Sequence, residues 1–360
     1  MRRAQESESF TMQGAGAHRK RVVTIGGGSG PFGLLSSLKF HPYHITAIVT
    51  MADSGGSSRR LMDEFGQLPF GDLRQALVAL SHKDALWRNV FTFRFRKNGK
   101  SQPEAEAAAH AQEVAEQAGV SGHSLGNLII SALQDINGGD LLKAIAAAQE
   151  LLGTSGTVLP ITKEKTDLCA VYEDGSLIRG ETDIDTRGQR NLGPLPAISR
   201  VYLDPVPAPC QEALDAIHEA DVIIIGPGDL YTSIVPNLLV KQVAEAVRTS
   251  TAQKNYVCNL MTKHGETDGF SASRFVKEIH HYLGGHVDRV FLHTGVFPDD
   301  LVEYYAEARQ SPVRPDVEEI RRLGVEVIVE NFLPAHHDHL IRHDAERLVQ
   351  AIFSSSDSVK

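Results

Sequence analysis

Short runs of β-branched and aliphatic residues alternate along the chain with stretches whose apolar positions have helical spacing. The first run, residues 22–25, ends in glycines and precedes a helix-like stretch from Leu34 to Leu38. A second buried run follows at residues 45–51. Two buried strands separated by a helix predict a βαβ unit, and hence a parallel sheet whose loops share one edge.

The same alternation continues toward the C-terminus. Between residues 157 and 203, however, short β-prone pieces are broken by turn residues, which predicts a small antiparallel excursion from the main sheet. Further strands are expected at residues 220–226, 256–260, 290–293 and 325–329, and helices at 72–80, 84–95, 125–133, 141–152, 271–283 and 345–353.

This pattern predicts an α/β protein with one doubly wound domain. We expect the domain to cover residues 21–353, with an insertion at about 155–203. Residues 1–20 are polar and residues 354–360 are rich in serine, so we expect a disordered tail at the start and a frayed tail at the end.

Composition narrows the choice of partners and compartment. The formal net charge of -9 argues against nucleic acid as the main partner, because phosphate binding usually needs a basic surface. The sequence has no apolar run near the ~18 residues that a membrane span requires. Only three cysteines occur, far apart, which fits a reducing compartment. We therefore expect a cytoplasmic protein with no membrane span.

Two glycine-rich turns follow predicted strands and are the first candidates for ligand binding. Residues 26–30 read GGGSG, and residues 226–228 read GPG. Glycine lets the backbone turn sharply and approach a ligand, while the next helix presents free N–H groups to an anion. The first turn is neither a P-loop nor a clean dinucleotide fingerprint. We expect both turns to contact an anionic group, with a purely structural turn as the alternative.

Polar clusters follow the strands at the same predicted edge, where ligands bind in open parallel sheets. Asp53 can hold Mg²⁺ or a hydroxyl, whereas Ser57 and Ser58 can bond phosphate or simply cap a helix. His123 and Asn127 are four residues apart, so we expect them on one face of a helix. The ligand-binding residues expected from these clusters are Gly27, Gly28, Ser29, Gly30, Asp53, Ser57, Ser58, Asp72, His123, Asn127, Gly226, Gly228, Asp229, Thr232, Ser233, Asn259 and Thr262, with Asp53 as the metal ligand.

Other roles are open for several of these residues. Asp72 can be an N-cap, followed by a helix-surface arginine at Arg74. Residues 259–267 can be a polar surface loop, although Asn259, Thr262 and Glu266 can also line the crevice.

In their order along the chain and in their residues, these clusters resemble the gluconeogenesis factor family, the sugar-nucleotide-binding relatives of 2-phospho-L-lactate transferase. The family usually has an aspartate where this chain has Ser54, which weakens a two-carboxylate Mg²⁺ site. The matching stretches are IGGGSG at 25–30, ITAIVTMADSGGSSRRL at 45–61, FGDLRQALVAL at 70–80, GHSLGNL at 122–128, GPGDLYTSIVPNLLV at 226–240, VCNLMTKHGETDGFSASRFV at 257–276 and IRHDAERL at 341–348.

The resemblance implies a Rossmann-like three-layer sandwich that binds a UDP-sugar such as UDP-N-acetylglucosamine. It also implies a link to cell-wall supply and cell shape during growth on gluconeogenic carbon. Family binding positions fall on Tyr305 and Arg342, with Tyr304 as the rival of Tyr305 if the register slips by one. An aromatic ring can stack on uracil, and a guanidinium can grip a pyrophosphate.

Two functions remain open. We favour a non-catalytic UDP-sugar-binding regulator, with a regulatory protein partner and a homo-oligomer as open options, because the sequence offers oxygen ligands but no base beside an activated nucleophile. The alternative is a Mg-dependent transferase of a phosphate-linked group, in which Mg²⁺ on Asp53 neutralises pyrophosphate charge. An NAD-dependent oxidoreductase would need the dinucleotide fingerprint.

Overall fold

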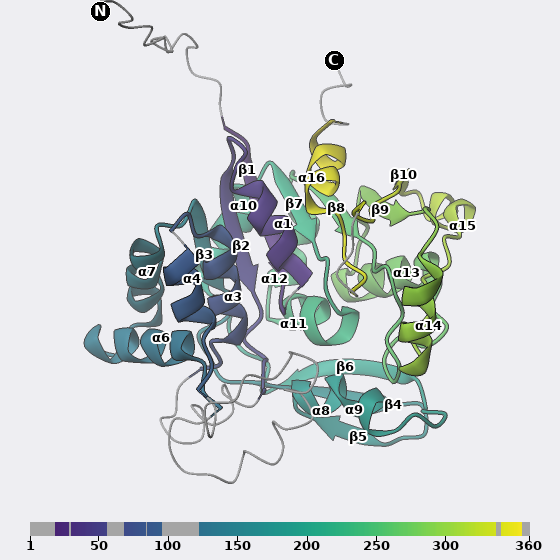
Figure 1. Cartoon of the computed structure of the whole chain (residues 1–360), viewed down its shortest axis with the longest axis horizontal. Coiled ribbons are helices and arrows are strands. Elements are labelled where there is room, and N and C mark those ends of the chain that lie inside the picture. Colours follow the sequence, from purple (N-terminus) through teal and green to yellow (C-terminus); the bar gives the residue numbers. More distant parts are fainter. Residues whose placement is uncertain are drawn as a thin grey trace, which may run out of the picture.

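A parallel sheet of seven strands forms the centre of the computed structural model, which describes residues 19–28, 30–55, 68–83, 85–95, 122–335 and 340–354. The strands are β1 (Arg21–Gly26), β2 (His44–Val49), β3 (Gly156–Pro160), β7 (Val222–Ile225), β8 (Gln253–Val257), β9 (Arg289–His293) and β10 (Glu326–Glu330). Their order across the sheet is β10-β9-β8-β7-β1-β2-β3, and all neighbours are parallel (Figure 1). This confirms the predicted, mainly parallel α/β fold.

The strand order reverses direction at β1. The sheet grows through β2 and β3 on one side of β1, and through β7 to β10 on the other. Ile25 of β1 therefore lies between Ile48 of β2 and Ile225 of β7. In doubly wound sheets the loops on either side of such a reversal diverge and leave a crevice at the carboxyl ends of the strands.

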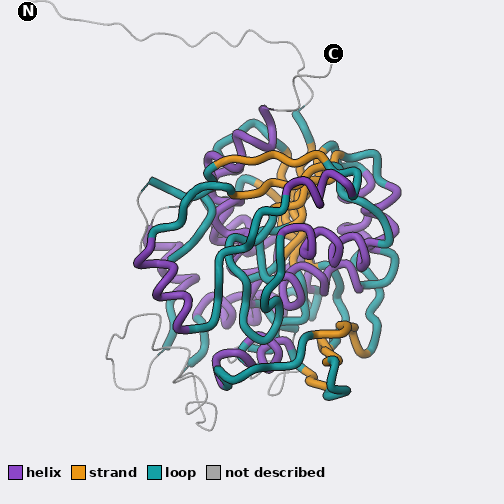
Figure 2. The backbone as a smooth tube through the Cα atoms, turned by 90° about the vertical axis from the view of Figure 1, so that its right-hand side faces the viewer, coloured by secondary structure: helices purple, strands orange, loops and turns teal. Residues whose placement is uncertain are grey.

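Helices cover both faces of the sheet, which gives three layers (Figures 1 and 2). Because side chains alternate along a strand, Val22 belongs to one core and Val23 to the other. Helices α1 (Gly30–Leu38), α3 (Gly71–Leu80), α6 (Leu125–Ile136), α7 (Leu141–Leu152) and α16 (Ala345–Ser354) pack into the core that contains Val22. The other core receives α10 (Gln211–His218), the π-helix η2 (Leu230–Ile234), α11 (Val235–Leu239), α12 (Val243–Thr249), α13 (Ala272–Leu283) and α15 (Val317–Arg322).

An antiparallel sheet of three strands, β4 (Asp167–Tyr172), β5 (Leu177–Arg179) and β6 (Ile198–Asp204), lies beside one end of the main sheet. Two short helices, α8 (Glu181–Asp185) and α9 (Arg187–Arg190), connect β5 to β6. The insertion was expected from about residue 155, but residues 156–160 form β3, which pairs with β2 in the main sheet. Thr157 and Val158 suit a strand of the main sheet as well as one of the insertion. Only the long-range pairing with β2 shows that they belong to the main sheet.

The small sheet shares a core with the large one. Tyr172 and Leu203 of the small sheet lie in the same buried cluster as Ile25 and Ile223 of the main sheet. In addition, the Val201 N–H donates to the hydroxyl of Tyr282 on α13, at 2.9 Å. The insertion is therefore attached to the main body by packing as well as by its two connections.

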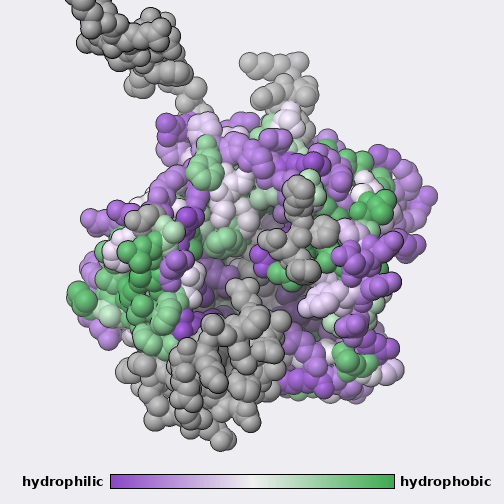
Figure 3. Space-filling model, viewed as in Figure 1, coloured by the Kyte–Doolittle hydropathy of each residue, from purple (hydrophilic) through white to green (hydrophobic). Residues whose placement is uncertain are grey.

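The surface is mostly polar, but hydrophobic side chains gather over one end. In Figure 3 this region lies on the left, over α6, α7 and α4 (Ala85–Thr92). Leu86, Phe93 and Ile136 are exposed there. Among the described residues, no helix is both long and apolar enough to cross a bilayer. Most of the two expected tails, residues 1–18 and 355–360, lies outside the described residues.

Candidate functional site

A cavity of about 680 Å³ lies at the carboxyl ends of the strands, where the strand order reverses. Its walls come from the loops after β1, β2, β7 and β8, from α3 and α6, from the small helix α8, and from the segment before α16. The expected residues that line it are Gly28, Gly30, Asp53, Asp72, Asn127, Gly228, Asp229, Thr232, Ser233, Asn259, Thr262, Tyr305 and Arg342.

Some expected residues do not line this cavity. Gly27 and Gly226 lie at strand ends but outside the lining, and Gly226 has a φ of 80° that favours glycine. His123 was expected on one helical face with Asn127, but α6 begins at Leu125, after an extended Ser124. Helical spacing therefore does not reach His123, which is buried away from the lining. Ser29, Ser57 and Ser58 lie outside the described residues.

The two glycine-rich turns contact each other directly. A Cβ placed on Gly30 would overlap the carbonyl oxygen of Pro227 and lie 2.7 Å from the Cα of Gly228. The Nδ2 atom of Asn237, which is fully buried, donates to the Ser233 carbonyl at 2.9 Å and to that of Gly26 at 3.4 Å. The turn after β1 and the π-helix after β7 are thus held together.

Asp72 and Arg74 occupy the first turns of α3 and are both buried. The helix begins at Gly71, so Asp72 lies inside it and is not an N-cap. Burial, and then the charge of Asp53, raises the pKa of Asp72 to about 7, while the Gly28 N–H partly offsets this. The alternative of a helix-surface arginine is wrong for Arg74, which is buried and whose Nε donates to Asn127 Oδ1 at 3.0 Å.

Carboxylates gather where the insertion meets the cavity. Glu181, at the start of α8, lines the cavity beside Asp53, and burial followed by the Asp53 charge raises its pKa well above the ordinary value. Ser54, which stands where the family has an acid, does not line the cavity; the Thr182 N–H donates to its hydroxyl at 3.0 Å. In the described part of the chain, no group of three His, Cys, Asp or Glu side chains is placed to hold a metal ion.

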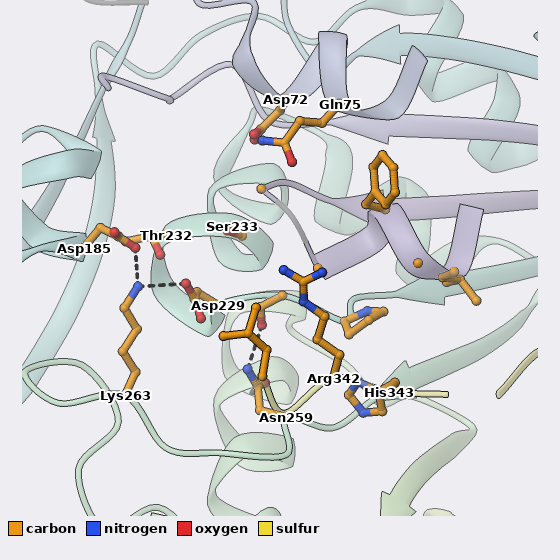
Figure 4. Close-up of a pocket in the computed structure, with 18 of the residues that line it drawn as sticks. Asp72, Gln75, Asp185, Asp229, Thr232, Ser233, Asn259, Lys263, Arg342 and His343 are labelled. Atoms are coloured by element: carbon orange, nitrogen blue, oxygen red, sulfur yellow. Dashed lines mark hydrogen bonds and ion pairs between the residues drawn. The ribbon is translucent and has the colours of Figure 1, made fainter. Parts of the chain in front are cut away.

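Lys263 lines the cavity, although the sequence analysis did not single it out. It follows Thr262 in the loop after β8, and its Nζ contacts Asp185 of α8, Asp229 Oδ2 at 2.7 Å and Glu266 Oε1 at 3.0 Å (Figure 4). Glu266, for which the sequence left both the crevice and a polar surface loop open, is buried and lies outside the lining. The sequence did contain a signal for Lys263, because it lies among the polar residues Asn259, Thr262 and Glu266 after a predicted strand. Its contact with Asp185 could not be predicted in this way.

The C-terminal wall carries Tyr305, from α14 (Asp299–Glu307), and Arg342. The Tyr305 hydroxyl accepts from the Ile341 N–H at 3.1 Å, which ties α14 to the segment that carries Arg342. Tyr304, the rival position, is 53% exposed and lies outside the lining. The Arg342 guanidinium points into the cavity in Figure 4.

Asn259 and His343 each make a hydrogen bond to the main chain of a loop beside this wall. Asn259 Nδ2 donates to the Gly228 carbonyl at 2.8 Å and so braces the turn after β7. His343 Nε2 lies 3.2 Å from the Cys258 carbonyl, and burial lowers the His343 pKa to about 4. At neutral pH His343 is therefore an uncharged donor, and the positive charge at this wall comes from Arg342.

Known proteins share both the sequence and the fold. Residues 22–333 match the model of the family described as 2-phospho-L-lactate transferase CofD. The chain is 40% identical to a gluconeogenesis factor of Halalkalibacterium halodurans, covering 93% of this chain and 96% of that protein, and 38% identical to a gluconeogenesis factor of Bacillus subtilis, covering 93% and 97%. A crystal structure of a UPF0052 family member from Bacillus halodurans superposes with a TM-score of 0.81 at 40% identity, covering 93% of this chain and 99% of that one.

Proposed function

Because the chain belongs to the CofD family and is similar to gluconeogenesis factors over nearly its whole length, we propose that it is a UDP-sugar-binding regulatory protein of the cytoplasm. The ligand would be a nucleotide sugar such as UDP-N-acetylglucosamine. Its occupancy would link gluconeogenic carbon use to cell-wall synthesis and cell shape.

The observation that carries this proposal is one cavity that contains both glycine-rich turns and the guanidinium of Arg342. Gly30 and Gly228 line the cavity without side chains, and the Arg342 guanidinium points into it (Figure 4). Backbone N–H groups and a guanidinium both suit phosphate oxygens. A volume of about 680 Å³ lies within the range of small-molecule and cofactor sites.

The proposed orientation follows from the walls. The Tyr305 ring would stack on uracil, Arg342 and the glycine turns would hold the pyrophosphate, and the sugar would extend toward α8 and Lys263.

The surface over α4 and α6, where Leu86, Phe93 and Ile136 are exposed, is the candidate contact for a protein partner or a second copy of the chain.

The test is the ligand-induced shift in melting temperature, because a ligand that binds only the native state stabilises it. We expect UDP-N-acetylglucosamine at a hundred times its Kd to add about 2.7 kcal/mol to the free energy of unfolding. Arg342→Ala should remove the shift and leave the melting temperature without ligand within a few degrees, since Arg342 is exposed. An Arg342→Ala protein that binds like the wild type would contradict the assignment.

One observation keeps a transferase as the second candidate. Asp53 and Asp72 lie close enough for the charge of Asp53 to raise the pKa of Asp72, and both line the cavity. Two carboxylates plus ligand phosphates suit Mg²⁺, so these side chains would hold the ion, whose chemistry is to neutralise phosphate charge. Incubation of labelled UDP-sugar with Mg²⁺ and candidate acceptors decides the matter: intact nucleotide supports a regulator, and turnover supports a transferase.

A further inference from the structure

The wall opposite the C-terminal segment has an unusual charge arrangement. The ammonium group of Lys263 has three hydrogens, and its Nζ lies within ion-pair distance of three carboxylates: Asp185, Asp229 and Glu266. The Lys263 side chain is only 17% exposed. Two hydrogen bonds, to Asp185 and Asp229, and the ion-pair contact with Glu266 therefore hold Lys263 in place, and turning toward a ligand phosphate would weaken at least one of these contacts.

The charges of this group leave the wall negative overall. Burial alone would lower the pKa of Lys263, but the surrounding carboxylates outweigh it and raise that pKa well above the ordinary value. Burial raises the pKa of Glu266 to about 8, so Glu266 is mainly protonated at neutral pH. Lys263 therefore faces two aspartates, Asp185 and Asp229, whose formal charges together exceed its own. Asp185 and Asp229 each use one oxygen for Lys263, and the other oxygen has no side-chain donor among the described residues.

A second, independent feature points to a ligand at the same place. The Thr232 side chain, which is 1% exposed, lines the cavity, and its Oγ1 has no hydrogen-bond partner in the described structure. In Figure 4 Thr232 lies between the carboxylates of Asp185 and Asp229. A buried hydroxyl without a partner costs roughly 1–3 kcal/mol, so a ligand that supplies the missing bond is favoured.

We propose that Asp185, Asp229 and Thr232 form a subsite for the hydroxyl groups of a neutral sugar. Carboxylate oxygens accept hydrogen bonds, and a sugar with neighbouring hydroxyls supplies the matching donors. A uronic acid sugar would bring a further negative charge against this wall and is disfavoured. Lys263 does not touch the sugar; it is a positioning residue that fixes both carboxylates. The inference rests on the proposed function, which supplies the nucleotide end of the ligand.

Calorimetry with UDP, UDP-glucose and UDP-glucuronate tests the subsite. We expect the wild type to bind UDP-glucose roughly tenfold more tightly than UDP and than UDP-glucuronate. Thr232→Val keeps the shape but removes the hydroxyl, and should bring the affinity for UDP-glucose close to that for UDP. Asp229→Asn should narrow the gap between UDP-glucose and UDP-glucuronate. Thr249→Val, at an exposed position of α12, is the matched control and should match the wild type.

Lys263→Met tests positioning against a general structural role. A positioning role predicts that the affinity for UDP-glucose falls toward that for UDP, because the two carboxylates lose their fixed places, while the affinity for UDP alone is kept. A merely structural role predicts that all three ligands weaken together, which would overturn the assignment of Lys263.

The outcomes separate this inference from the function on which it rests. If the wild type binds UDP but does not distinguish the two sugars, and Thr232→Val changes nothing, the sugar subsite is wrong and the proposed function stands. If the wild type binds none of the three uridine ligands, the proposed function fails and the subsite fails with it.

Discussion

Asp72 is a buried carboxyl group in the first turn of a helix, and its pKa of about 7 links folding to pH. Since this pKa lies above the ordinary value of 3.8, the folded chain holds a proton that the unfolded chain has lost. Asp72 therefore contributes full stability below about pH 4, and that contribution is lost as the pH rises toward 7. The loss can reach about 1.4 kcal/mol per pH unit.

Asp72→Asn should remove this pH dependence, because an amide does not ionise. We expect the variant to gain stability relative to the wild type at pH 8 and to gain little at pH 4, measured by urea unfolding without ligand or metal. Asp140→Asn is the matched control. Asp140 caps α7, and hydrogen bonds from the Lys143 and Leu142 N–H groups hold its pKa below the ordinary value, so its contribution is lost toward acid. Parallel pH curves for Asp72→Asn and the wild type would contradict the assignment.

At the scale of elements, the start of α1 fits against the turn after β7 with no room for a methyl group. Gly30→Ala would place its Cβ against the Pro227 carbonyl, so one of the two main-chain turns must shift. We expect a loss of about 1–3 kcal/mol in the free energy of unfolding, and weaker UDP-sugar binding by calorimetry. Gly33→Ala, in the same helix, has only Ala345 Cβ at 3.8 Å and should be neutral or stabilising by up to about 1 kcal/mol.

The critical comparison is between the melting temperatures of Gly30→Ala and Gly33→Ala. If Gly30→Ala and Gly33→Ala melt alike, the close contact between the turns is wrong. If Gly30→Ala loses stability and still binds UDP-sugar like the wild type, the contact is right, but the exposed main chain does not bind the phosphates.

The sequence could predict those elements whose evidence is local. The β-branched runs predicted strands β1 and β7. The glycines that follow each run predicted two turns, and both turns line the same cavity. It could not predict that Arg74 is buried, because helix α3 has hydrophobic neighbours on every side and periodicity alone puts an arginine on the surface.

Other features depend on residues far apart in the chain. Lys263 and Asp185 meet only because the insertion packs against the loop after β8, which no local pattern indicates. The helix that carries Tyr305 has Leu301 as its only buried residue, so its apolar pattern is too weak to find. Both features belong to the cavity, but only the Lys263–Asp185 contact required tertiary structure to be seen, because the family resemblance had already assigned Tyr305 to the site.

At the scale of the whole molecule, the small sheet shares the core of the large one, so we expect both to unfold in one transition. A Cβ on Gly188 of α9 would lie 2.6 Å from the carbonyl carbon of His264, in the loop after β8. Gly188→Ala should therefore separate the insertion from the main body at a cost of about 1–3 kcal/mol. Differential scanning calorimetry should show one peak for the wild type and a broadened or split one for the variant.

Limited proteolysis checks the same prediction independently. Cleavage within residues 167–204 should be slow in the wild type and faster in Gly188→Ala, while the main sheet stays resistant. Two separate transitions in the wild type would instead mean that the insertion is an autonomous unit.

The two long walls of the cavity are encoded far from each other in the chain. Arg342 and Tyr305 come from C-terminal segments, whereas Asp185 belongs to the insertion and Asp229 to the loop after β7. Mutations can therefore accumulate on one wall without reshaping the other. If the chain binds a nucleotide sugar as proposed, a lineage with this architecture can change the sugar to which it responds and still recognise the same nucleotide carrier.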